Sequence, residues 1–540
     1  MSEFDVWTNK WAQDIYLQKY SMDRQETWAD TCKRVVENVC GQLLSAEDKE
    51  LIYRLMRERK FIPGGRYLYS AGRPLHQVNN CFLFRAEDSR EGWADLMGKI
   101  TSSLMTGGGI GVDYSAVRPK GAKISRTGGE CTGPIALMEM VNEAGRHIMQ
   151  GGQRRSAVWA GLLWSHKDIK EFMAKKDWSD GVKTLKDQDF NFPAPLDGTN
   201  ISVNYDTEFF VAMENKDHPL HKHAKDVWKE NCRQAFSTAE PGMAFNFLKD
   251  LESLRNACTE VVSEDDSDKC NLGTAWINRF STKEEFAAAL PYMTKFLICG
   301  GLYSDVPTEK IREVGLKNNR IGLGLGGMHE WLMLRGSKYE VTPELHKWLN
   351  IYERESDAAA FLAARELGVA KPKGVRAIAP TGTIGILAET TTGIEPLFCK
   401  AYKRRYLKGT TWHYQYVVDG AVKRLQEQGV KVEDIQDTYD ISFKERVKFQ
   451  ADVQQYVDMA ISSTCNLPAW GSEENNETTL AKNSRTLLKY AKRLRGFTCY
   501  PDGARGGQPL TRVPLEEALA QEGVEYEEKE HECVGGVCGI

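Results

Sequence analysis

The residues best suited to chemistry lie in one short segment, Asn256-Ala257-Cys258-Thr259-Glu260. It presents an amide, a thiol and a carboxylate at alternate positions. If the segment is extended, these three side chains share one face. A carboxylate within hydrogen-bond reach is sufficient for general-base catalysis, and a thiol beside it adds redox chemistry. By itself, the pattern is equally that of a loop with a stray cysteine.

Two further thiols, Cys533 and Cys538, lie in the last ten residues, HECVGGVCGI. Because chain ends are usually frayed, a packing role for them is not expected. The pair could be a metal clip, an unpaired accident or a mobile redox dithiol. A zinc clip would need two more ligands, and only His531 is near. Gly535 and Gly536 would give the pair backbone freedom, and the acidic segment before it would give it reach.

The surrounding pattern predicts the elements that position these groups. From residue 80 to about residue 400, short apolar runs alternate with helices, which argues for an α/β fold. Before that, segments 26–40 and 46–60 carry apolar residues at helical spacing. We therefore expect an N-terminal helical region followed by one large α/β domain.

The C-terminal part of the chain changes character. Segments 445–463 and 478–495 are helical in pattern, and from Gly503 the composition turns Gly/Pro-rich and then acidic. Such a composition is typical of a weakly packed segment. The predicted organisation is a helical region (1–60), a catalytic barrel (61–505) and a flexible redox tail (506–540).

Composition excludes several classes of protein. The chain has 540 residues, a net charge of −4, 41% hydrophobic and 27% charged residues, which gives no general attraction to nucleic acid or to an anionic membrane. No signal pattern and no apolar run long enough to span a bilayer is seen, so we expect a cytoplasmic protein. The thirteen cysteines are free thiols by default. Five of them are predicted to be buried core residues: Cys32, Cys40, Cys232, Cys299 and Cys399.

Several stretches resemble the large, catalytic subunits of ribonucleotide reductases, and they occur in that family's chain order. Asn-x-Cys-x-Glu, followed twelve residues later by the cysteine of CNLG, resembles the catalytic loop. The other matching stretches are NNCFLF (79–84), MTGGGIGVDYSAVRPKGAKIS (105–125), QGGQRRSA (150–157), APTGTIGILAETTTGIEPLF (379–398) and the C-terminal Cys-x4-Cys. The resemblance implies a ten-stranded α/β barrel, made of two five-stranded parallel halves around a central finger loop.

The resemblance also implies the chemistry. Cys258 would form a thiyl radical that takes the 3′ hydrogen of a ribonucleotide, Glu260 would be the general base on the 3′-OH, and Asn256 would hold a ribose hydroxyl. Cys81 and Cys270 would supply two electrons as the 2′-OH leaves as water, and would end as a disulfide. The tail thiols Cys533 and Cys538 would reduce that disulfide with electrons from a thioredoxin- or glutaredoxin-like protein.

Two nucleotide sites are implied in the same way. Small residues and backbone N–H groups at a turn entering a helix could hold the substrate phosphates. Family members often have serine at the last position of this turn, where the chain has glycine, so one hydroxyl contact is in doubt. The substrate residues implied are Gly109, Thr381, Gly382, Thr383, Ile384 and Gly385.

A deoxynucleotide or ATP effector that selects the substrate base would bind at a homodimer interface. The residues implied are Asp88, Arg118, Gly152, Gln153 and Arg154. Asp88 also has a structural interpretation as the N-cap of the helix that follows it, and the two roles are compatible. The residues before about position 60 do not resemble the family's ATP-binding cone, so we expect no overall activity switch of that kind.

The source of the radical is left open by the sequence. In one class of the family a ferritin-like small subunit with a dimetal centre feeds a relay that ends in two adjacent tyrosines, and this chain has Cys499-Tyr500 there. A second class cleaves adenosylcobalamin beside the cysteine and often has one tyrosine in a Y-x-DG-x-R context. The sequence leans to adenosylcobalamin. A relay through oxidisable Cys499 stays possible.

Other functions fit less well. A glycyl-radical enzyme draws electrons from formate and would not need Cys81 and Cys270. A non-catalytic nucleotide-binding scaffold would be expected to lose Cys258 or Glu260. A simple dithiol oxidoreductase would show Cys-x-x-Cys at a helix start, which is absent from the sequence. No metal site is predicted.

Overall fold

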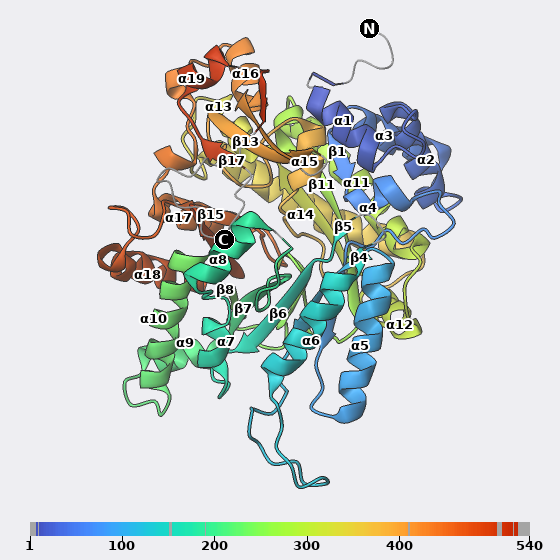
Figure 1. Ribbon diagram of the computed structural model, residues 1–540. Coiled ribbons are helices and arrows are strands. Elements are labelled where there is room, and N and C mark those ends of the chain that lie inside the picture. The colour runs from blue at the N-terminus through green and yellow to red at the C-terminus, as the bar shows by residue number, and fades with distance from the viewer. Residues whose placement is uncertain are drawn as a thin grey trace.

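The computed structural model describes residues 7–8, 10–150, 154–189, 191–408, 411–504, 510–521 and 523–527. Within these ranges the chain is a mixed α/β structure, with helices packed around one large sheet (Figure 1). The tail thiols Cys533 and Cys538 and the loop residues Gly152 and Gln153 lie outside the described residues.

The large sheet consists of two sets of parallel strands. In the first set the order is β2 (Cys81–Arg85), β3 (Gly109–Asp113), β6 (Val158–Leu163), β7 (Thr199–Tyr205) and β8 (Gly242–Phe245). In the second set it is β11 (Asp268–Trp276), β12 (Ile321–Gly326), a short segment at 376–378, β15 (Thr464–Leu467) with the bridge at Ile461 before it, and β16 (Gly496–Pro501).

The two sets close on each other. β2 pairs antiparallel with β11, and β8 pairs antiparallel with β16, so the described strands form a closed barrel. β1 (Phe61–Pro63) adds to β11 outside this ring. The predicted ten-stranded barrel of two five-stranded parallel halves is therefore confirmed.

Helices cover the outside of both halves, because each strand turns alternate residues outward. On β3, Ile110 and Val112 join the apolar core under the helices, whereas Gly109, Gly111 and Asp113 take the opposite face. The first half packs against α5 (Arg90–Met105), α6 (Pro134–His147), α7 (Ile169–Ala174), α9 (Thr207–Glu214), α10 (His221–Thr238) and α18 (Glu477–Ala491).

The second half shares its core with the N-terminal helices and with several helices that follow β11. These are α1 (Lys10–Lys19), α2 (Trp28–Cys40), α3 (Ala46–Arg57), α4 (Gly65–Ser70), α11 (Lys283–Tyr303), α13 (Met328–Met333), α14 (Pro343–Glu366), α15 (Gly382–Ala388) and α17 (Phe443–Gln454). The remaining helices are α8 (Asp180–Gln188), α12 (Glu309–Asn318), α16 (Gly420–Glu427), α19 (Leu515–Ala520), η1 (Ile277–Arg279), η2 (Val432–Asp434) and η3 (Thr438–Asp440).

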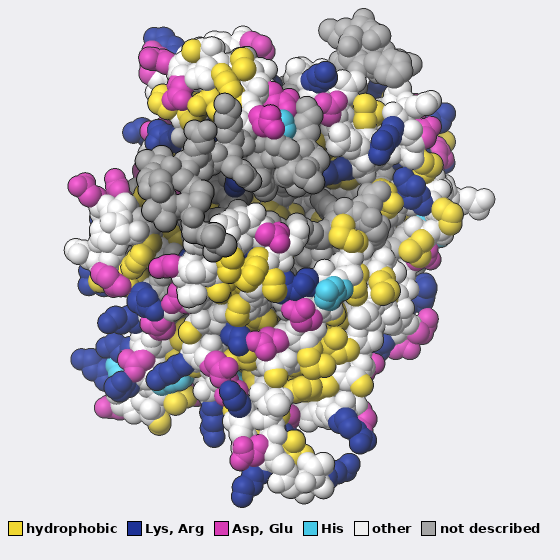
Figure 2. Space-filling model, viewed as in Figure 1, with side chains coloured by type: hydrophobic (Ala, Val, Ile, Leu, Met, Phe, Trp, Pro, Cys, Tyr) yellow, Lys and Arg dark blue, Asp and Glu magenta, His cyan; other side chains and the backbone are white. Residues whose placement is uncertain are grey.

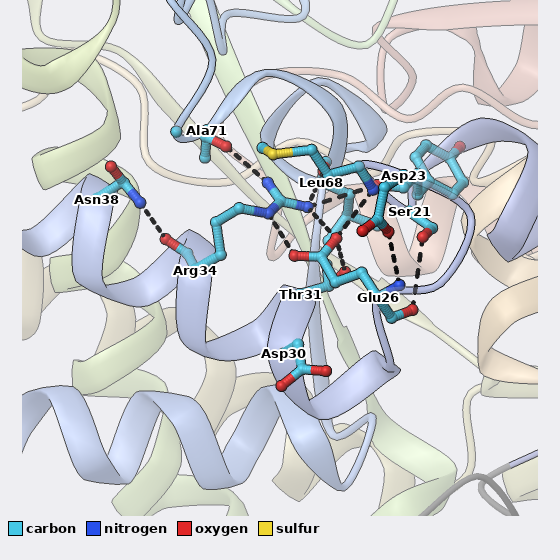
Figure 3. A network of polar contacts seen from close by, with 12 residues as sticks. Ser21, Asp23, Glu26, Asp30, Thr31, Arg34, Asn38, Leu68 and Ala71 are labelled. Carbon is cyan, nitrogen blue, oxygen red and sulfur yellow. Dashed lines mark hydrogen bonds and ion pairs between the residues drawn. The ribbon is translucent and has the colours of Figure 1, made fainter.

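α2 and α3 fall where helical periodicity predicted them, and a polar network ties α2 to the end of α4 (Figure 3). Arg34 pairs with Glu26 at 2.6 Å and donates to the carbonyl oxygens of Leu68 and Ala71 at the end of α4. Thr31 also donates to Glu26, at 2.8 Å. Both charged side chains are only about a tenth exposed (12% and 11%), so the pair is weakly screened by solvent.

Part of the segment 506–540, which is expected to be a flexible tail, forms strands. β17 (Leu510–Arg512) and β18 (Glu525–Glu527) pair antiparallel with the two outer edges of the hairpin β13 (Ala401–Lys408) and β14 (Thr411–Val418). The Tyr414 and Tyr526 rings stack at 5.0 Å. A hairpin leaves two free strand edges, and the C-terminal segment covers both.

The prediction of five buried cysteines and the prediction of no membrane-spanning segment have different outcomes. All five cysteines predicted as core residues are buried. Contrary to expectation, one described helix, α11, is long and apolar enough to cross a membrane by length and composition. However, 56% of that stretch is buried inside the protein, and it contacts α14, α2 and β11 as a core helix does.

Candidate active site

The segment Asn256–Glu260, singled out in the sequence, is the tip of a hairpin inside the barrel. This hairpin is the finger loop. Strands β9 (Leu254–Arg255) and β10 (Val262–Ser263) pair antiparallel, and β9 contacts β2, β3 and β6. The approach is so close that a Cβ added to Gly111 of β3 would lie 1.8 Å from the carbonyl oxygen of Arg255. The barrel wall therefore needs glycine at this position.

The tip is a turn rather than the extended strand that the alternation suggested. Thr259 has φ of +71°, and its N–H donates to the carbonyl oxygen of Asn256 at 3.0 Å. Two contacts hold the turn to the barrel: Asn200 donates to the Ala257 carbonyl at 3.1 Å, and the N–H of Ala460 donates to the Glu260 carbonyl at 2.8 Å. The functional side chains are gathered by the turn and not by strand alternation.

Asn256 links the tip to Cys81 of β2. Its Nδ2 donates to Sγ of Cys81 at 3.0 Å, and its Oδ1 accepts from the N–H of Val261 at 2.9 Å. Burial, reinforced by the nearby Glu260 and Cys258, raises the pKa of Cys81 well above that of a free thiol. Cys258, Glu260 and Asn256 therefore all lie around Cys81.

Cys81 and Cys270 are direct partners across the seam between the two halves of the barrel. They face each other in the antiparallel register of β2 and β11, and Gly109 is the partner of Cys81 on the other side. Opposed antiparallel residues have Cα atoms about 4.5–5.5 Å apart, which is within the range that a disulfide spans. Both are buried free thiols. Their placement suits a pair that is oxidised together.

Glu260 has the properties of a base that awaits a ligand. It is 1% exposed, and its Oε2 has no hydrogen-bond partner among the described residues. Burial raises the pKa of its carboxyl group to about 7, although a hydrogen bond from Asn256 opposes the shift. A buried acceptor without a partner is costly, so a substrate hydroxyl placed here would satisfy it.

This pKa predicts the pH dependence of catalysis. A general base must be ionised, so kcat/KM should rise about tenfold per pH unit below about pH 7 and level off above it, because kcat/KM reports the free enzyme. Rates measured from pH 5.5 to 8.5 at low substrate would test this, with far-ultraviolet circular dichroism confirming that the protein stays folded. A flat profile between pH 6 and 8 would contradict the role of Glu260.

The predicted phosphate segment lies at the start of α15, directly after the barrel segment 376–378. Thr381 caps this helix with φ of +48°, and its hydroxyl accepts from the N–H of Gly393 at 3.1 Å. Gly382 is exposed, and a Cβ there would meet nothing within 4 Å, which leaves room for a ligand. At Gly385 a Cβ would lie 2.6 Å from the side chain of Thr392, so Thr392 fills the space that a serine would need.

The two described effector candidates contact each other. Arg118 Nε donates to Asp88 Oδ2 at 2.7 Å, and both side chains are about a third exposed (37% and 31%). The N-cap of α5 is Ser89, whose hydroxyl accepts from the N–H of Gly92, so the N-cap interpretation of Asp88 is wrong. Arg154 lies in the short strand β5 (Arg154–Arg155), which pairs with β4 (Met149–Gln150).

The two relay candidates point to opposite faces of β16. The Cys499 thiol is 3% exposed and donates to the carbonyl oxygen of Ala235 in α10 at 3.2 Å, so it faces the outer helix layer. By alternation Tyr500 faces the other way, toward the barrel interior. At the start of the same strand, Gly496 lies beside Thr259 of the finger loop. This orientation counts against Cys499 as a relay residue and leaves Tyr500 as the candidate.

Sequence reasoning missed the residues that support the site. Asn200 holds the loop tip, Gly111 admits it, and Thr392 occupies the space beside Gly385. A signal existed only for Gly111, since a glycine inside a strand pattern suggests a close backbone approach. The other two become recognisable only from their contacts in the folded structure.

Comparison with known proteins agrees with this geometry. The family model described as "Ribonucleotide reductase, barrel domain" matches residues 79–215, 182–353 and 365–500. A vitamin B12-dependent ribonucleoside-diphosphate reductase of Mycobacterium tuberculosis (strain CDC 1551 / Oshkosh) is 25% identical over 600 residues, which cover 95% of this chain and 82% of the relative.

Further relatives are similarly distant. A putative adenosylcobalamin-dependent ribonucleoside-triphosphate reductase of Mycobacterium phage D29 is 24% identical over the whole of both chains. Among solved structures, the class Id ribonucleotide reductase alpha subunit of Actinobacillus ureae has a TM-score of 0.73 at 15% identity and covers 92% of this chain and 98% of its own. That likeness supports the fold.

Fold and site together define an α/β-barrel oxidoreductase, with a thiol-bearing finger loop beside a buried dithiol. The chain belongs to the ribonucleotide reductase barrel-domain family. Members of this class reduce ribonucleotides, so the substrate is a nucleotide and the reaction consumes a reductant.

Proposed function

We propose that the chain reduces ribonucleotides at the finger loop, with Cys258 as the hydrogen-abstracting thiol and Cys81 and Cys270 as the reducing pair. The observation that carries this proposal is the convergence of these groups around Cys81, at the seam where the two barrel halves meet. Relatives named as diphosphate and as triphosphate reductases are both similar to this chain.

The proposed reaction balances over these residues. The Cys258 thiyl takes the 3′ hydrogen atom, and Glu260 takes the 3′-OH proton at its unpartnered oxygen. The 2′-OH leaves as water with a proton from the Cys81 and Cys270 pair. That pair gives its second hydrogen to C2′, loses two electrons in total and closes as a disulfide. Glu260 returns its proton to the 3′ oxygen, and Cys258 returns its hydrogen atom to C3′. Asn256 orients a ribose hydroxyl, and residues 381–385 bind the phosphates.

We further propose adenosylcobalamin as the radical source. Two relatives are named as vitamin B12-dependent and a third as putatively adenosylcobalamin-dependent. When bound, this cofactor supplies a carbon-centred radical able to take a thiol hydrogen atom. Cys258 is partly exposed, whereas Asn256 and Glu260 are buried. By its place on β16, Tyr500 would border the cofactor. The outward thiol of Cys499 makes a relay from a small subunit the less supported alternative.

Purified protein supplied only with ribonucleotide, adenosylcobalamin and dithiothreitol is expected to form deoxyribonucleotide. Tyr500→Phe should keep at least about half of this activity, because no relay through a phenol is needed. Product measured by chromatography tests this, with cyanocobalamin as the inactive control. If turnover required a second protein and Tyr500→Phe were inactive, the small-subunit alternative would replace this proposal.

The effector and partner assignments are also proposals. Asp88, Arg118 and the 152–154 loop would bind a deoxynucleotide at a homodimer interface. Exposed methionines on and beside α5 and α6 support an interface there: Met105 is 63% exposed, Met140 48% and Met149 53%. The ratio of the four products with and without each deoxynucleotide, together with sedimentation, tests both points; unchanged ratios and a monomer would reject them. A thioredoxin- or glutaredoxin-like reductant and a cytoplasmic location complete the proposal.

A further inference from the structure

The last turn of α15 is held by two arginines from distant parts of the chain. Arg59, just after α3, donates through Nη1 to the carbonyl oxygen of Leu387 at 3.1 Å. Arg279, in η1 after β11, donates a short hydrogen bond to the carbonyl oxygen of Ala388. The terminal carbonyls of a helix lack partners within the helix and carry partial negative charge. The two arginines therefore satisfy and neutralise this end of α15.

Arg59 also holds Glu389, the residue that caps the C-terminal end of α15. Arg59 Nη1 and Glu389 Oε2 are 2.7 Å apart, and the two side chains are only 9% and 4% exposed. The backbone N–H of Thr8 donates to the other carboxylate oxygen at 3.0 Å. Breaking so buried an ion pair by removing one member is costly. Each partner therefore depends on the other for its position.

Both members of this pair have unusual backbone conformations. Arg59 has φ of +56° and Glu389 has φ of +51°, in the left-handed region that favours glycine. Residues with side chains remain there only where the surroundings enforce the conformation, and such strain concentrates at functional sites. A helix cap made for stability alone would use glycine at position 389.

The N-terminal segment completes the arrangement. The Arg59 guanidinium lies 5.3 Å from the centre of the Trp7 ring. Trp7 in turn stacks on Tyr16 of α1 at 5.3 Å and meets Trp28 of α2 edge-on at 5.8 Å. α1 also contacts α15 directly. The N-terminal helices thus reach the end of α15 through Trp7, Thr8 and Arg59.

We propose that Arg59 and Glu389 are positioning residues that hold α15 in the orientation needed to bind the substrate phosphates. This inference rests on the proposed function, which puts the phosphates at the other end of the same helix. α15 has seven residues, too few to be stable alone, so its contacts set its orientation. Its length is about 10 Å, so a tilt at Glu389 displaces the amides of residues 382–384. Displaced amides bind a phosphate less well.

Steady-state kinetics of Arg59→Met and Glu389→Gln test the inference. The KM for the ribonucleotide is expected to rise about fivefold to tenfold, with kcat within about twofold of wild type. The inhibition constant of inorganic pyrophosphate should rise in parallel. The double variant should be no worse than either single one, because the two residues act as one pair. Arg54→Met, which breaks an exposed ion pair in α3, is the matched control and should leave KM unchanged.

Two further variants keep the inference falsifiable. Glu389→Gly removes the carboxylate but relieves the backbone strain, so a raised KM in this variant supports positioning even if Arg59→Met fails to fold. Thr383→Val probes the phosphate site itself. Unchanged KM values at positions 59 and 389, with a raised KM in Thr383→Val, would overturn the inference while the proposed site stands. Unchanged KM in all variants would mean that the phosphates bind elsewhere, and the inference would fall with the site.

Discussion

Cys258→Ser is expected to abolish nucleotide reduction, with a loss of more than about a thousandfold in kcat. A thiol can give up its hydrogen atom to a radical and take one back from a sugar carbon, whereas the stronger O–H bond of serine cannot do this reversibly. Cys258 is half-exposed at the loop tip, so the smaller serine should leave no cavity in the core. Folding stability should change by less than about 1 kcal/mol.

The experiment separates chemistry from folding and binding. The variant should bind a ribonucleotide with a dissociation constant within about twofold of wild type, because the sulfur itself makes no binding contact in the proposed reaction. Cys131→Ser is the matched control. Cys131 is also a half-exposed free thiol, but it lies in the loop between β3 and α6, away from the barrel interior, and its variant should keep full activity. Measurable turnover by Cys258→Ser would remove it from the mechanism.

Those parts of the architecture that depend on local sequence patterns were predictable from the sequence. Apolar runs alternating with helices indicated the α/β class, and the resemblance implied the two parallel halves. The segment at 376–378 belongs to one of these apolar runs. The bridge at Ile461, however, falls within 445–463, a segment that is helical in pattern, whereas α17 ends at Gln454. β18 was missed because its sequence, Glu-Tyr-Glu, reads as part of an acidic tail. It pairs because the edge of β14 is free, which is a tertiary effect.

The candidate site was likewise predictable where local sequence determines it, and not where tertiary structure does. The residue types of the finger loop indicated its chemistry. The turn that brings them together depends on a left-handed backbone conformation at Thr259, which no sequence pattern predicts for threonine. The register that opposes Cys81 to Cys270 joins positions far apart in the chain. The direction of Cys499 required knowing which face of β16 meets α10. Long-range register therefore decides which of the chemically suited residues can act together.

The tail thiols are expected to matter only when the reductant is a protein. In the double variant Cys533→Ser, Cys538→Ser, turnover with thioredoxin should fall by about a hundredfold or more, while turnover with dithiothreitol should stay within about twofold of wild type. Cys270 is completely buried and Cys81 only 6% exposed, so a folded reductase cannot reach the disulfide they would form. A small dithiol can diffuse in, and a tail with its own dithiol can carry electrons between the two places.

The described structure sharpens this prediction, because the chain is anchored up to Glu527 by the pairing of β18 with β14. Cys533 follows six residues later, so it can reach about 20 Å from that anchor when extended. Without added reductant, the double variant should still complete one turnover per site, since Cys81 and Cys270 begin as free thiols. A single turnover measured by rapid quench, together with steady-state rates for both reductants, separates electron delivery from chemistry. Cys399→Ser, which removes a buried thiol elsewhere, controls for the loss of a cysteine as such. Equal and undiminished rates with thioredoxin and dithiothreitol would show that electrons reach Cys81 and Cys270 by another route.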